Sequence, residues 1–122
     1  KKTWRAQFAT PREAPIDLID ALKDAPLDDA VLVDCITMWL TNLMLADQDT
    51  DAAVAQLAAV IPQVSQPLVL VSNEIGQGVV PDTAMGRQFS RIQGRANQVL
   101  AATCDTVVFV TAGLPNVLKG SL

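Results

Sequence analysis

Hydrophobic positions along the chain follow two kinds of pattern. Three runs are almost continuously aliphatic, which predicts strands at residues 30–34, 68–74 and 106–112. Elsewhere apolar residues recur at spacings of three and four, which predicts helices. The predicted helices are one with Pro15 in its first turn and Ile16, Ile19 and Leu22 on one face, and three more at residues 37–46, 52–64 and 83–104.

The alternation of these strands and helices predicts an α/β fold. Strands that are continuously apolar are buried on both faces, and helices between them indicate parallel crossover connections. We therefore expect a doubly wound parallel sheet covered by helices on both faces, which makes three layers. No linker divides the chain, so residues 1–122 are expected to form a single domain.

The N-terminal end of the sequence does not fit a complete sheet of this kind. Three strands are few, because common doubly wound sheets have about five or six. The opening, KKTWRAQF, has no initiator Met and no helix or strand period. We therefore expect at least one further βα unit before residue 1, and a domain that is incomplete at its N-terminus.

Polar and glycine-rich residues follow each predicted strand. In an open parallel sheet, ligands bind in the crevice beyond the carboxyl ends of the strands. We therefore expect the three strand ends to converge on one rim. The residues at these ends are Asp34 for the first strand, Ser72, Asn73, Glu74, Gly76 and Gly78 for the second, and Thr111 and Gly113 for the third.

Asp34 is the single carboxylate at the end of the first aliphatic run. A strand-end acid of this kind is placed to hold Mg²⁺, directly or through water, beside the phosphates of a nucleotide. The alternative interpretation is that Asp34 only caps the helix that follows. The local sequence leaves both interpretations open.

The loop SNEIGQGVVP, residues 72–81, places Glu74 where a strand meets a loop. Its glycines allow close backbone approach or a positive φ, as ligand-binding loops often require. A plain glycine-rich turn with a solvated acid fits the same residues.

The long predicted helix carries Arg87, Arg91 and Arg95 at i, i+4 and i+8, so they form one stripe. A solvated or subunit-facing surface explains this stripe. Phosphate binding by planar guanidinium groups is the rival interpretation.

Composition narrows the classes of function. The net charge of −4 argues against a nucleic-acid partner. Histidine is absent, which excludes an imidazole base, nucleophile or ligand within these residues.

Cys35 and Cys104 lie in predicted buried elements without a CxxC motif, so we expect core thiols. With no apolar run of about 18 residues and no cleavable leader, we expect a soluble, cytoplasmic protein without a membrane span.

Three segments together resemble a known family. They are REAPIDLIDAL at residues 12–22, VLVDCITMWLTNL at 31–43, and the long stretch from VLVSNEIGQGVVP to TAGLP at 69–115. The resemblance is to the bifunctional adenosylcobinamide kinase / adenosylcobinamide-phosphate guanylyltransferases of cobalamin biosynthesis, and it covers nearly all of residues 12–119. Its most specific part is the loop of residues 71–81 followed by GRANQ at 94–98.

This resemblance implies a P-loop-type α/β enzyme that uses GTP or ATP with Mg²⁺. Such an enzyme phosphorylates the aminopropanol hydroxyl of adenosylcobinamide and then transfers GMP from GTP to that phosphate, giving adenosyl-GDP-cobinamide. It also implies a homotrimer with sites near the subunit boundaries. The implied site residues are Glu13 and Asp34 as nucleotide contacts, Asn73, Glu74, Gly76 and Gly78 in the signature loop, and Arg95 and Asn97 in the helix motif.

Two central features of the family are missing from these residues. The glycine-rich phosphate loop ending in Gly-Lys-Ser and the histidine that carries GMP both lie upstream of the Glu13 motif in the family, and neither occurs here. We therefore assign no catalytic nucleophile and expect the chain to be the carboxyl-terminal two-thirds of such an enzyme. The alternatives are an active-site-degenerate, non-catalytic α/β module for binding or assembly, and a P-loop kinase for another alcohol.

Overall fold

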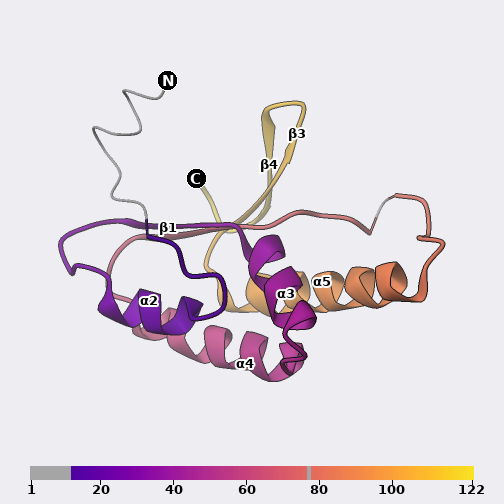
Figure 1. Ribbon diagram of the computed structural model, residues 1–122. Helices are drawn as coiled ribbons and strands as arrows, with labels where there is room; N and C mark the ends of the chain where they lie inside the picture. The colour runs from indigo at the N-terminus through magenta and orange to yellow at the C-terminus, as the bar shows by residue number, and fades with distance from the viewer. Residues whose placement is uncertain (1–11, 77) are drawn as a thin grey trace, which may run out of the picture.

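The computed structural model describes residues 12–76 and 78–122 (Figure 1). Helices and strands alternate over most of this length, as the hydrophobic pattern predicts. In chain order the elements are α2 (Leu18–Asp24), β1 (Val31–Asp34), α3 (Ile36–Leu45), α4 (Thr50–Val60), the 3₁₀ helix η1 (Ile61–Gln63), β2 (Leu68–Val71), α5 (Ala84–Thr103), β3 (Val107–Thr111) and β4 (Leu114–Lys119).

β1 and β2 form a parallel pair, in register from Val31 opposite Leu68 to Asp34 opposite Val71. This confirms an α/β fold with a small parallel sheet. Within the described residues all four α-helices lie on one side of this pair, so two layers are seen rather than the expected three (Figure 1). The other face of the sheet carries aliphatic side chains that remain exposed, among them Leu32 and Val69.

The third predicted strand does not join this sheet. β3 pairs instead with β4 in a separate antiparallel hairpin, which projects away from the helices (Figure 1). Ala112 and Gly113 join the two strands with φ of 54° and 76°, the pair of positive φ values that a tight type I′ hairpin turn requires. This turn supplies β3 with a partner from its immediate neighbourhood, so the expectation of three parallel strands in one sheet is wrong for the described residues.

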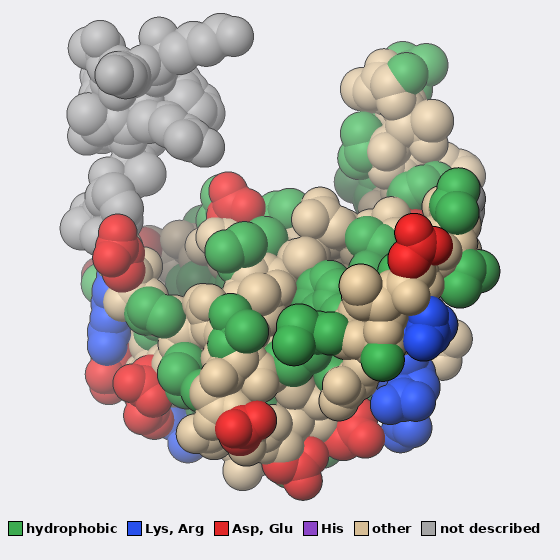
Figure 2. Space-filling view, turned by 45° about the vertical axis from the view of Figure 1, so that its right-hand side comes forward, with side chains coloured by type: hydrophobic (Ala, Val, Ile, Leu, Met, Phe, Trp, Pro, Cys, Tyr) green, Lys and Arg blue, Asp and Glu red, His purple; other side chains and the backbone are tan. Residues whose placement is uncertain are grey.

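The hairpin is tied to the end of α5 by one side chain. Lys119 Nζ donates to the carbonyls of Ala101 and Ala102 at 3.0 and 3.1 Å. The last carbonyls of a helix have no partner within the helix, so a lysine there satisfies them and complements the helix dipole. The outer part of the hairpin stands clear of the rest of the molecule, with hydrophobic side chains exposed along it (Figure 2).

The hydrophobic core lies between the inner face of the β1–β2 pair and the helices. Ile36, Leu40 and Leu57 are fully buried there, and Trp39 is nearly so. The burial of such apolar side chains supplies most of the stability of a domain of this kind. The remaining core residues are Leu18, Leu22, Val33, Leu43, Val54, Ala96 and Leu100.

Side-chain caps fix where two helices begin. Asp49 accepts a hydrogen bond from the Ala52 N–H at 3.0 Å, so α4 begins two residues before the predicted start. Thr83 accepts from the Gly86 N–H at 3.0 Å and caps α5. Pro62 lies where α4 gives way to the 3₁₀ turn, because proline cannot donate the next helical hydrogen bond.

The predicted first helix begins later than expected. Pro15 and Ile16 precede α2, and their carbonyls accept hydrogen bonds from Asn42 Nδ2 at 3.0 Å and Trp39 Nε1 at 2.9 Å. These bonds hold the segment against α3 instead of within a helix. In the described part of the chain, no helix has both the length and the apolar character to cross a membrane.

Candidate functional site

The carboxyl ends of β1 and β2 lie side by side. Asp34 is the last residue of β1 and pairs with Val71, the last residue of β2, so the chain leaves both strands at the same edge. Asp34 and Ser72, the residue after Val71, are both exposed. Two of the three predicted strand ends therefore meet. The third, at Thr111 and Gly113, lies at the turn of the separate hairpin and does not join them.

Asp34 does not cap the helix that follows it. The N-cap residue of α3 is Cys35, and no side chain caps this helix. The capping interpretation of Asp34 is therefore wrong. Its carboxylate is held at the sheet edge by the strand and is exposed to solvent.

The loop after β2 is fixed by both backbone groups of Asn73. The Asn73 N–H donates to Thr37 Oγ1 of α3 at 3.0 Å. The Asn73 carbonyl accepts from Asn97 Nδ2 of α5 at 3.0 Å. Because the two partners come from different helices, this point of the loop has one defined position relative to both.

Asn97 is itself oriented by two neighbours. Its Oδ1 accepts from Ser72 Oγ at 2.7 Å and from Gln93 Nε2 at 3.0 Å, and Gln93 Nε2 also donates to Ser72 Oγ at 2.9 Å. Gln93 is fully buried, which is unusual for a glutamine. We call Ser72, Gln93 and Asn97 the amide cluster.

Sequence reasoning identified Asn97 but missed Gln93 and Thr37. The signal for Gln93 was present in the helical spacing. Gln93, Ala96 and Leu100 are the buried residues of α5, at i, i+3 and i+7, and Asn97 adjoins them at i+4. A polar residue on a buried face is rarely without a partner, and here its partners come from the strand end.

Glu74 is folded back onto its own loop. Its Oε1 accepts from the Gly76 N–H at 2.7 Å. A Cβ at position 76 would lie 2.9 Å from the same oxygen, closer than real Cβ contacts allow. A side chain at position 76 would therefore displace the flexible Glu74 carboxylate, whereas a Cβ at Gly78 would meet nothing within 4 Å.

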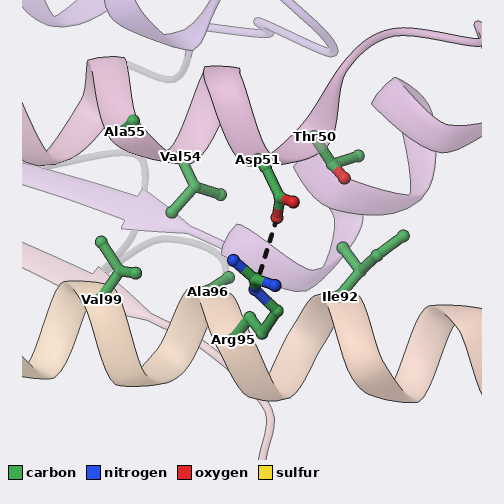
Figure 3. A pocket seen from close by; sticks show the side chains of 8 residues that line it. All are labelled: Thr50, Asp51, Val54, Ala55, Ile92, Arg95, Ala96 and Val99. Atoms are coloured by element: carbon green, nitrogen blue, oxygen red, sulfur yellow. Dashed lines mark ion pairs between the residues drawn. The ribbon is translucent and has the colours of Figure 1, made fainter.

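Arg95 lies on a different side of α5 from Asn97, because residues two apart on a helix do not face each other. It pairs with Asp51 of α4, with 3.7 Å between Arg95 Nε and Asp51 Oδ1, and both side chains are 64% exposed. The pair sits in a groove of about 170 Å³ between α4 and α5 (Figure 3). The structure therefore does not bring Arg95 to the strand ends.

The arginine stripe is used locally at two of its three positions. Arg87 Nη1 donates to the carbonyls of Pro81 and Asp82, each at 3.1 Å, and Arg95 pairs with Asp51. Arg91 is exposed. These contacts favour the interpretation of the stripe as a surface over that of a phosphate site.

Glu13 lies in the segment that Asn42 and Trp39 hold against α3, and its side chain is exposed. The role of Glu13 as a nucleotide contact stays a prediction.

The carboxylates at the strand ends are too few to hold a metal ion by themselves. Among the described residues, no three His, Cys, Asp or Glu side chains gather as a metal-binding group. A nucleotide-bound Mg²⁺ needs only one or two carboxylates, because phosphates and water fill its other positions. The single exposed carboxylate of Asp34 fits that requirement.

The family model for cobinamide kinase / cobinamide phosphate guanyltransferase matches residues 2–118 of this chain. The chain belongs to this family. Three similar proteins are each named a bifunctional adenosylcobalamin biosynthesis protein. CobP of Pseudomonas aeruginosa is 40% identical over 88% of this chain. CobU of Salmonella typhimurium is 36% identical over 79% of this chain, and CobU of Escherichia coli is 34% identical over 71% of it.

The 122 residues of this chain span only part of the length of those relatives. The matches cover 64%, 62% and 56% of their respective lengths. The family match includes both strand ends, the loop after β2 and the whole of α5. The residues that meet at the sheet edge are therefore all within the shared region.

Proposed function

We propose that the protein phosphorylates adenosylcobinamide and then transfers GMP from GTP to adenosylcobinamide phosphate, forming adenosyl-GDP-cobinamide and pyrophosphate. The observation that carries the proposal is the register of β1 and β2. It places the Asp34 carboxylate at the same edge as the loop that begins at Ser72. Crevices of this kind, beyond the ends of parallel strands, are where α/β enzymes bind nucleotides.

In this proposal Asp34 holds Mg²⁺ beside the phosphates of the nucleotide, either directly or through water. A Mg²⁺ ion held there would supply positive charge to neutralise the phosphate oxygens during transfer. The loop from Asn73 to Gly76 lies next to it, with a backbone fixed by Thr37 and Asn97. We propose that this loop positions the substrate phosphates, because a rigid backbone lowers the entropy that alignment would otherwise cost.

The charges at this edge require further cationic groups. Asp34 and Glu74 are both exposed acids, and a triphosphate carries about four negative charges, so the two would repel it without compensation. We propose that a glycine-rich phosphate loop with its lysine, and the histidine that carries GMP, belong to sequence outside these 122 residues. The greater length of the relatives supports this.

The finer architecture follows from the same proposal. We propose a three-layer sheet of the P-loop type, in which further polypeptide covers the exposed face of β1 and β2 that bears Leu32 and Val69. We also propose a homotrimer in the cytoplasm, as the family resemblance implies. The exposed apolar side chains of the hairpin, such as Leu114 and Leu118, support burial against other polypeptide.

The test is turnover by the full-length protein that carries this segment. The protein is incubated with Mg²⁺, adenosylcobinamide phosphate and GTP labelled at the α-phosphate. It should form labelled adenosyl-GDP-cobinamide and release unlabelled pyrophosphate. If no labelled adenosyl-GDP-cobinamide forms but the protein binds adenosylcobinamide tightly, a non-catalytic module would be favoured. Phosphorylation of other alcohols without guanylyl transfer would favour a different kinase.

A further inference from the structure

Gln93 combines full burial with an incomplete set of hydrogen bonds. Its Nε2 donates to Ser72 Oγ and Asn97 Oδ1, whereas its Oε1 is buried and has no partner among the described residues. An unpaired buried carbonyl is unfavourable for stability, and such groups are rare in folded proteins. An apolar residue of the same size would avoid this penalty, so stability alone does not explain a glutamine here.

The NH₂ group of Gln93 and the carbonyl of Asn73 both favour the same orientation of the Asn97 amide. A hydroxyl can donate or accept, so Ser72 would tolerate either orientation of the Asn97 amide. The Gln93 NH₂ group only donates, and it therefore requires the oxygen of Asn97 to face it. Asn97 Nδ2 is then directed at the Asn73 carbonyl, 3.0 Å away.

The opposite orientation of Asn97 would release the loop. It would set the Asn97 NH₂ against the NH₂ of Gln93, and the Asn97 oxygen against the Asn73 carbonyl. Both contacts are repulsive, and Asn73 would keep only its bond to Thr37. Gln93 is thus connected, through one intermediate side chain, to the backbone that leads into Glu74.

We propose that Gln93 is a positioning residue for guanylyl transfer: its buried amide orients Asn97, and Asn97 holds the loop after β2 in the geometry that the reaction needs. This inference rests on the proposed function. The two halves of the Gln93 amide have opposite effects. Its NH₂ group orients Asn97, whereas its buried, unpaired oxygen lowers the stability of the fold.

The test compares Gln93→Met with wild type in the full-length protein. Methionine keeps the length of the side chain and removes both the carbonyl oxygen and the NH₂ group of the amide. We expect kcat for guanylyl transfer to fall about tenfold, with KM for GTP changed by less than about threefold, because alignment is lost rather than ground-state binding. The melting temperature should stay the same or rise. Gln56→Met, at an exposed glutamine of α4, is the matched control and should leave kcat, KM and melting temperature unchanged.

A second measurement follows the loop without using activity. In Gln93→Met, hydrogen exchange at the amides of Asn73 to Gly76 should be faster than in wild type, and in Gln56→Met it should not. Unchanged kcat together with unchanged exchange in Gln93→Met would overturn the inference, as would a loss of kcat explained by a lower melting temperature. Wild-type protein that performs no guanylyl transfer would refute the proposed function and with it the catalytic role of Gln93. The exchange measurement would then still decide whether Gln93 holds the loop.

Discussion

The backbone N–H of Asn73 donates to Thr37 Oγ1 at 3.0 Å, and this bond joins the ends of the two parallel strands. Thr37 is in the first turn of α3, three residues after Asp34, whereas Asn73 is two residues after the end of β2. The Thr37 hydroxyl therefore adds a direct link between the end of β1 and the loop after β2, beside the strand register and the bond from Asn97. A change at Thr37 should disturb the site without touching its acids.

Replacement of Thr37 by valine should loosen the loop. Valine has the same shape without the hydroxyl, so the Asn73 N–H would lose its partner, and we expect the free energy of unfolding of the full-length protein to fall by about 1 kcal/mol. Amide hydrogen exchange at Asn73 should become faster. Thr37→Ser keeps the hydroxyl and is the matched control. Equal exchange at Asn73 in the valine and serine variants would show that the bond does not hold the loop.

Replacement of Leu57 by alanine should weaken the whole fold. Leu57 is fully buried between α4 and the rest of the core, so the truncation leaves a cavity. We expect the free energy of unfolding to fall by about 2–5 kcal/mol, measured by urea denaturation. Leu27→Ala, at a leucine that is 79% exposed, should change it by less than about 0.5 kcal/mol. Similar losses in the two variants would contradict the assignment of the core.

Cys104 should titrate at a higher pH than an ordinary thiol. Burial raises the pKa of the Cys104 thiol above its usual 9.0; Lys119 lowers this pKa and Asp105 raises it further. The folded protein thus keeps the thiol form at a pH where an unfolded chain has lost the proton. The contribution of this group to stability is therefore present below about pH 9 and is lost as the pH rises through the folded-state pKa.

Alkylation of Cys104 by iodoacetamide, followed by mass spectrometry of its peptide, measures this titration directly. The rate should reach half its maximum above pH 9.0 in wild type. Lys119→Met should move the midpoint higher still, because it removes the positive charge that favours the thiolate. A midpoint at or below 9.0 in wild type would contradict the burial of this thiol.

Local sequence patterns predicted most of the elements because most of them are fixed by local interactions. The apolar runs predicted β1 and β2, and Asp34 at a strand end was correctly placed at the same edge as the loop after β2. Helix boundaries shifted by a few residues where a cap or a proline decided them, as at Asp49 and Pro62. The first helix was misplaced because Trp39 and Asn42, far along the chain, take its expected first carbonyls.

The hairpin and the amide cluster were missed for different physical reasons. The strand pattern of β3 was correct, but the positive φ values of Ala112 and Gly113 turn the chain straight back and give it an antiparallel partner. Pro115 also made β4 hard to predict. Proline has no N–H to donate, so it is tolerated in a strand only where that hydrogen bond is not needed. The helical period places Gln93 on the buried face of α5, but it does not reveal the hydrogen bonds to Ser72 and Asn97 that give Gln93 its role.

We propose that GTP with Mg²⁺ binds at the ends of β1 and β2, with Asp34 beside the metal. The most direct measurement is the Kd of the full-length protein for GTP, by isothermal titration calorimetry, for wild type and for Asp34→Asn with and without Mg²⁺. Asp28→Asn, at an exposed acid before β1, is the matched control and should bind like wild type. We predict that Asp34→Asn binds GTP about tenfold more weakly with Mg²⁺, a difference of about 1.4 kcal/mol, and no more weakly without it. Equal affinity of wild type and Asp34→Asn in the presence of Mg²⁺ would show that Asp34 does not hold the metal beside GTP.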